Sequence, residues 1–138
     1  MNPTIPQSTE TATQVELAAT VARAATAGDV QIATAEDIDP ASANHAELRP
    51  GDGVHQELVT ITVADGDNFC CVDRFDHLNE DGTPGPLRLD TELYVAHPYG
   101  NTGTGPWLAV HEADLADVAK VMTAAAEFVT AYREEVTQ

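Results

Sequence analysis

Residues 58–75, LVTITVADGDNFCCVDRF, decide the fold of this chain. Apolar and polar side chains alternate before an Asp-Gly pair, and Asp-Gly between two strand-like runs is a strong short signal of a β-hairpin. A two-residue turn at Asp65-Gly66 places Ile61 opposite Cys70, whereas a four-residue turn places Val63 there. Either register puts Cys70 on the core face of the hairpin, because side chains alternate along a strand.

The two cysteines of the chain, Cys70 and Cys71, are adjacent and should therefore point to opposite faces of one strand. Zinc sites favour separated cysteines, as in C-x2-C, so we predict that Cys70 is a core residue. A metal site formed by Cys71 with His77 and nearby acids such as Asp81 is the alternative. The segment HLNEDG (77–82) resembles part of an EF-hand loop, but its first and twelfth positions are His77 and Arg88 instead of carboxylates.

Two further patterns indicate an α+β domain. LRLDTELYV (87–95) alternates like the hairpin and predicts a third strand with Arg88, Asp90 and Glu92 on its solvent face, and PWLAV (106–110) predicts a fourth. Residues 112–136 predict one long helix, because apolar residues recur at spacings of three and four. These are Leu115, Val118, Met122, Ala125, Val129, Tyr132 and Val136. We therefore predict a three- to four-stranded antiparallel β-meander covered by a long C-terminal helix, with an N-terminal helix.

The N-terminal third of the chain is less regular. Residues 1–12, rich in Pro and Thr, predict a disordered tail, and residues 13–138 are expected to form a single domain. Within it we expect a helix over 13–27, a short strand over 30–35 and a mobile loop over 36–56. The buried face of that first helix should be mostly alanine, with Val15, Ala18, Ala19, Ala22 and Ala25.

The charge of the chain argues against several classes of function. There are 23 acidic and 6 basic residues, for a formal net charge of −17. Binding to nucleic acid phosphates or to an anionic membrane needs clustered cations, so we expect neither. The acids are spread along the sequence, which favours adaptation to high salt or a compositional bias over imitation of nucleic acid. We find neither a secretory signal nor an apolar run of bilayer length, and we expect a cytoplasmic protein.

No motif indicates catalysis. The two serines, Ser8 and Ser42, lie outside any G-x-S-x-G pattern, and the five histidines lack the spacing of a zinc hydrolase. We therefore expect a non-enzymatic protein-binding module that carries no cofactor and recognises an unknown protein partner. Two alternatives remain open: an acidic inhibitor that imitates nucleic acid and blocks a DNA-binding protein, and a small metal-binding domain.

The expected contact residues lie in the glycine-rich segment 97–106 with the tryptophan that follows it, and at the end of the long helix. They are Tyr99, Trp107, Val129, Tyr132 and Val136. The helix is longer than a four-stranded sheet is wide, so its last turns need a further packing partner. We favour the alanine face of the first helix within a monomer, and the alternative is a homodimer through the C-terminal helix.

Overall fold

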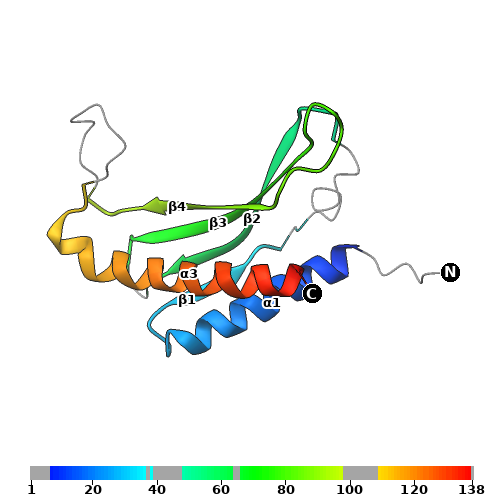
Figure 1. Ribbon diagram of the computed structural model, residues 1–138. Coiled ribbons are helices and arrows are strands. Elements are labelled where there is room, and N and C mark those ends of the chain that lie inside the picture. The colour runs from blue at the N-terminus through cyan, green and yellow to red at the C-terminus, as the bar shows by residue number, and fades with distance from the viewer. Residues whose placement is uncertain (1–6, 37, 39–47, 64–65, 98–108, 138) are drawn as a thin grey trace.

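The computed structural model describes residues 7–36, 38, 48–63, 66–97 and 109–137. In chain order it contains α1 (Gln7–Ala25), β1 (Gln31–Thr34), β2 (Gly53–Thr62), β3 (Phe69–His77), β4 (Arg88–Tyr94), the 3-10 turn η1 (Glu112–Asp114) and α3 (Leu115–Val136). The four strands form one antiparallel sheet in the order β1-β2-β3-β4, and both helices lie against the same face (Figure 1). The predicted α+β class and the helix-covered meander are confirmed.

The hairpin has the register that the sequence predicts for a turn centred on Asp65-Gly66. Ile61 pairs with Cys70, and neighbouring pairs continue to Thr62 and Phe69. A β-bulge interrupts the ladder between Glu57 and Val59. The extra residue there is Leu58, and both it and Val59 are fully buried although they are adjacent. The bulge therefore adds a large apolar side chain to the core, and strict alternation does not anticipate this.

Several element boundaries differ from the expected ones. Helix α1 begins at Gln7, inside the expected tail, and β2 begins at Gly53, inside the expected loop 36–56. Strand β3 extends to His77, so its last residues supply pairing partners for the start of β2. The fourth strand is β1, which pairs with β2. Ala109 and Val110 lie outside any strand, and residues 106–108 of the expected fourth strand lie outside the described residues.

The buried face of α3 is rotated relative to the expected stripe. Its buried residues are Val121, Ala124, Ala125, Phe128, Ala131 and Tyr132. The prediction was wrong for Leu115 and Met122, which remain 54% and 40% exposed. The α3 backbone lies close beneath β3, where the Cys70 thiol donates to the carbonyl oxygen of Val121 at 3.7 Å.

Alanine dominates the contact between the two helices, as predicted. Val15, Ala18, Ala19 and Ala22 of α1 are fully buried, whereas Ala25 is exposed. Small side chains let helix backbones approach closely, so little apolar area is buried per turn. The start of α1 lies beside the end of α3, where Gln14 Nε2 donates to the carbonyl oxygen of Glu135 at 3.5 Å.

The last turns of α3 pack within the chain. Tyr132 is fully buried, and its hydroxyl accepts a hydrogen bond from Arg74 Nη1 at 2.7 Å. Val129 and Val136 are partly buried against the same core. Tyr132 is therefore a core residue and cannot serve as a surface contact. Within the described part of the chain, no helix combines the length and apolar composition of a bilayer span.

Candidate binding surface

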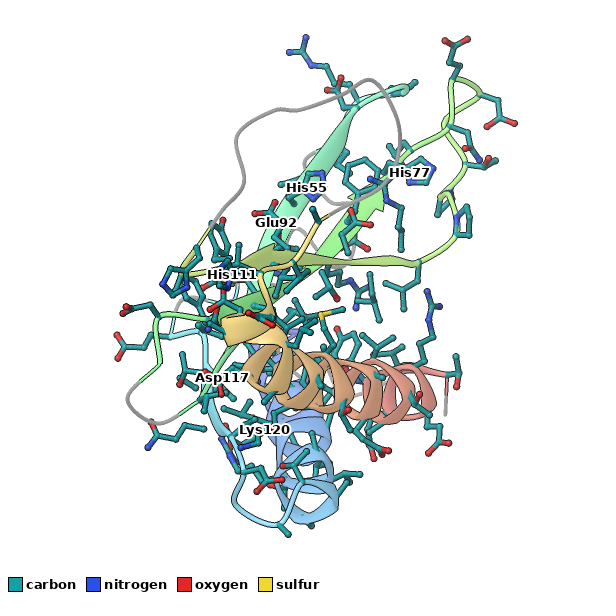
Figure 2. All side chains as sticks on the ribbon, turned by 90° about the vertical axis from the view of Figure 1, so that its left-hand side faces the viewer. His55, His77, Glu92, His111, Asp117 and Lys120 are labelled. Atoms are coloured by element: carbon teal, nitrogen blue, oxygen red, sulfur yellow. The ribbon has the colours of Figure 1, made fainter. Side chains whose placement is uncertain are left out.

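The face of the sheet opposite the helices carries most of the chemically distinctive side chains. Alternation along β3 puts Phe69, Cys71, Asp73, Phe75 and His77 there, and the strand register adds His55, Glu57, Thr60 and Thr62 from β2 and Arg88, Asp90, Glu92 and Tyr94 from β4. We call these thirteen residues the open face. His55, His77 and Glu92 mark its position in Figure 2, on the side of the sheet away from α1 and α3. Among the described residues, neither helix covers this surface.

A row of three carboxylates crosses the middle of the open face. Glu57, Asp73 and Asp90 occupy directly paired positions on β2, β3 and β4. Glu92 follows Asp90 on the same side of β4. Burial raises the pKa of Asp73 above its usual value, and the negative charges of Glu92 and Glu57 raise it further. Like charges directly opposite each other destabilise a sheet, so this row would be stabilised by a cation that binds across it.

Among the described residues, the ion pairs of this row all involve Asp90, at its β4 end. Arg88 Nη2 lies 2.9 Å from Asp90 Oδ2, and its hydrogen bonds lower the pKa of the Asp90 carboxyl. His55 Nδ1 is 4.0 Å from the same oxygen. The described residues show no comparable ion pair for Glu57, Asp73 or Glu92. The negative potential is therefore least compensated over β2 and β3.

Aromatic side chains lie on both sides of the carboxylate row, Phe75 next to it and Phe69 beyond the intervening positions of Cys71 and Glu92. At one end Phe69 and Tyr94 stack with ring centroids 4.6 Å apart, and Tyr94 is 44% exposed. At the other end Phe75 contacts the His55 ring at 4.5 Å, and the Arg88 guanidinium lies 4.7 Å above its centroid. Partly exposed aromatics around acidic groups are suited to bind long cationic side chains through cation–π contacts and ion pairs.

The two cysteines lie on opposite faces of β3, as predicted, and both are free thiols. Cys70 is fully buried on the helix side, whereas Cys71 is 9% exposed and lies 3.7 Å from Thr60 Oγ1 on the open face. Burial raises the pKa of the Cys71 thiol to about 11, and Glu57 contributes to that shift. Cys71 is therefore protonated at neutral pH, which makes it a poor nucleophile and metal ligand.

The structure does not bring the three metal-ligand candidates together. Cys71 and His77 are six residues apart on one strand, a span of about 20 Å. The His77 ring stacks on Phe75 with centroids 5.3 Å apart and packs against Gly85, where no larger side chain fits. Asp81 Oδ1 already accepts hydrogen bonds from the backbone N–H of Thr83 at 2.9 Å and its hydroxyl at 2.6 Å. No cluster of three metal-binding side chains occurs among the described residues.

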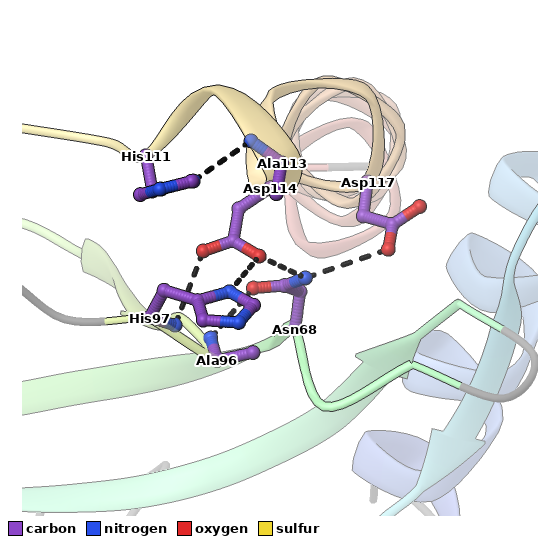
Figure 3. Close-up of polar contacts among 7 residues, drawn as sticks. All are labelled: Asn68, Ala96, His97, His111, Ala113, Asp114 and Asp117. Atoms are coloured by element: carbon purple, nitrogen blue, oxygen red, sulfur yellow. Dashed lines mark hydrogen bonds and ion pairs between the residues drawn. The ribbon is translucent and has the colours of Figure 1, made fainter.

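A buried polar network joins the end of β4 to the start of α3 (Figure 3). Asp114, only 2% exposed, accepts from the His97 backbone N–H at 3.1 Å and from Asn68 Nδ2 at 3.2 Å, and its Oδ1 lies 3.0 Å from His97 Nδ1. Burial opposes ionisation, but the hydrogen bonds from His97 and Asn68 hold the pKa of Asp114 below its usual value. Asn68 Oδ1 also accepts from Ala96 N at 2.8 Å. Each of these hydrogen bonds links two separate segments, so we interpret the network as one that stabilises the fold.

The structure describes only three of the predicted contact residues. Tyr99 and Trp107 lie outside the described residues, and Tyr132 is buried in the core. Val129 and Val136 are partly exposed on α3, on the other side of the sheet from the open face. No family model, no curated protein and no solved structure matches this chain.

The sequence indicated only fragments of the open face. The alternation of residues 87–95 predicted that Arg88, Asp90 and Glu92 point away from the helices, and this is confirmed. The sequence does not predict the contributions of His55 and Glu57, because its turn-forming residues predict a loop over 36–56, where β2 begins at Gly53. The sequence signal for the start of β2 is VHQELV (54–59), in which apolar and polar residues alternate weakly until the bulge at Leu58 interrupts the pattern.

Proposed function

We propose that this protein is a non-enzymatic binding module whose open face binds a cationic segment of a partner protein. The observation that carries the proposal is the carboxylate row Glu57–Asp73–Asp90, with aromatic rings farther along the strands on both sides of it, on a sheet face that neither helix covers. Arginine or lysine side chains would relieve repulsion within the row, and their aliphatic stems would pack on the rings. The formal net charge of −17 would speed the approach of such a partner by electrostatic steering.

The test uses purified protein and a displayed peptide library of random sequence, followed by calorimetry with the selected peptides. We expect the library to yield peptides rich in Arg or Lys with interspersed aromatic residues. Their affinity should fall steeply between about 0.1 M and about 1 M salt, over which the Debye length shortens from about 10 Å to about 3 Å.

Matched charge variants localise the binding. Replacing Glu57 and Glu92 together by glutamine removes two open-face charges and should weaken binding at least tenfold. The control replaces Glu127 and Glu134 by glutamine, which removes two exposed charges from α3. Equal weakening in both double variants would mean that the net charge alone attracts the peptides, and the open face would then not be the site.

Imitation of nucleic acid is not favoured by the geometry of the row. Three paired strands span about 10 Å across the sheet, and duplex DNA presents about six phosphate charges along that length. The row offers three carboxylates, and Arg88 neutralises one of them. Competition against duplex DNA for a DNA-binding enzyme tests this alternative directly.

A further inference from the structure

Strand β4 forms one edge of the described sheet. It has seven residues and pairs with β3 alone, while the opposite edge is the four-residue β1. An edge strand presents unpaired backbone N–H and C=O groups that can pair with a strand from another chain. At the start of β4, the exposed Arg133 Nη2 donates to the carbonyl oxygen of Leu87 at 3.2 Å.

An apolar flank of α3 runs beneath this edge. Met122 is 40% exposed and Leu115, seven residues earlier on the same flank, is 54% exposed. Arg133 follows Met122 by eleven residues, which is again the same flank, and its contact with Leu87 places the C-terminal end of that flank near the start of β4. Figure 1 shows β4 above the middle turns of α3, and the first turns of the helix extend past the end of the strand.

The side chains of β4 complete this surface from above. Leu89 and Leu93 pair with Arg74 and Cys70, which face the helices, so both leucines point toward α3. They are only partly buried against the core. We call Leu89, Leu93, Leu115 and Met122 the β4 shelf. A shelf of apolar side chains below an unpaired strand edge is suited to accept one further strand, whose apolar residues would cover it.

The negative charge of β4 determines which kind of strand can pair with its edge. Asp90 and Glu92 of β4 lie on the open face, so a strand added beside them would place alternate side chains next to these carboxylates. A second copy of this chain would bring another formal charge of −17 to the same edge. A cationic strand would instead place Lys or Arg beside Asp90 and Glu92 and its apolar residues over the β4 shelf.

We propose that the cationic partner binds by adding a strand to β4, at its edge in the described sheet, with apolar residues over the β4 shelf and basic residues toward the open face. This inference rests on the proposed function, because it specifies how that partner is held. Backbone hydrogen bonds would supply affinity, and the alternation of apolar and basic residues would supply specificity.

The experiment uses a probe peptide as long as β4 in which Leu and Lys alternate. Two N-methylated forms serve as paired probes, one methylated at the leucines and the other at the lysines. In an antiparallel pair, N–H groups of alternate residues point to the same edge of a strand, so only one form loses the hydrogen bonds to β4. We expect one form to lose binding and the other to retain it. Equal behaviour of the two forms would overturn the inference.

Protein variants test the β4 shelf independently. Leu115→Ser with Met122→Ser should weaken binding of the unmethylated probe at least tenfold, equivalent to about 1.4 kcal/mol. The control, Leu17→Ser with Val21→Ser, changes two residues of α1 that are 48% and 49% exposed and should leave binding unchanged. All four side chains are substantially exposed, so neither double variant removes a fully buried core residue.

The outcomes separate the two proposals. Loss of binding in Glu57→Gln/Glu92→Gln with full binding in Leu115→Ser/Met122→Ser would overturn strand addition and leave the open face as the binding site. A wild-type protein that binds neither the probe nor any library peptide would refute the proposed function itself. If sedimentation shows that the wild type is a dimer and that Leu115→Ser/Met122→Ser is a monomer, then a second copy of the chain occupies the β4 edge and the inference is overturned.

Discussion

Removal of one buried hydroxyl, in Tyr132→Phe, should destabilise the fold measurably. The Tyr132 hydroxyl accepts a 2.7 Å hydrogen bond from Arg74 Nη1, and Arg74 Nε donates to both carboxylate oxygens of Asp76 at 3.0 and 2.8 Å. Tyr132 is fully buried, and the side chains of Arg74 and Asp76 are only 12% and 3% exposed. The substitution leaves the ring and its packing in place and removes one neutral acceptor from a buried guanidinium.

The expected magnitude follows from the charge on the donor. Hydrogen bonds to charged groups contribute about 1.5–3 kcal/mol to the free energy of unfolding. For 138 residues, an unfolding entropy of about 2.1 cal/mol/K per residue gives about 0.29 kcal/mol/K in total, so a loss of about 2 kcal/mol lowers the Tm by about 7 °C. Thermal and urea denaturation at pH 7, followed by circular dichroism, would measure both quantities.

Tyr94→Phe is the matched control. Its hydroxyl donates to Glu92 Oε2 at 2.8 Å, so the same atom and one hydrogen bond are lost, but Tyr94 is 44% exposed. Water replaces the lost partner there, and we expect a change of less than about 0.5 kcal/mol. If both variants shift the Tm equally, or if neither does, then burial of Arg74 does not make the Tyr132 hydrogen bond important and our reasoning about the core is wrong.

Three further predictions concern charge and the thiols. The pKa of Asp73 is raised in the folded protein, so ionisation of Asp73 destabilises the fold as the pH rises above about 4. Asp73→Asn should therefore raise the Tm at pH 7. This gain in Tm should shrink in melts below about pH 4, where the Asp73 carboxyl is protonated in both states. The Tm of the wild type should increase between about 0.01 M and about 1 M salt as screening weakens repulsion, and a flat profile would show that the charge of −17 does not limit stability. Native-state thiol labelling followed by mass spectrometry should modify Cys71 before Cys70, because Cys71 is 9% exposed and Cys70 fully buried; the reverse order would contradict their placement.

The carboxylate row illustrates why a site of this kind is hard to read from a sequence. Glu57, Asp73 and Asp90 are separated by 16 and 17 residues, by subtraction of their numbers, and become neighbours only through the strand register. The bulge at Leu58, the residue after Glu57, shifts that register by one residue. Without the bulge, the residue opposite Asp73 would be Leu58, and Glu57 would point toward the helices.

The sequence by itself determined which side chains near the hairpin turn face the core, the opposite orientations of Cys70 and Cys71, and the presence of a long C-terminal helix. These features depend on alternation and helical periodicity, which are properties of consecutive residues. Only the tertiary structure decided which flank of α3 is buried. Apolar residues such as Val121, Met122 and Phe128 surround much of that helix, so periodicity alone does not select one side. Contacts with the sheet and with α1 selected Val121 and Phe128 for the core, and they left Met122 40% exposed.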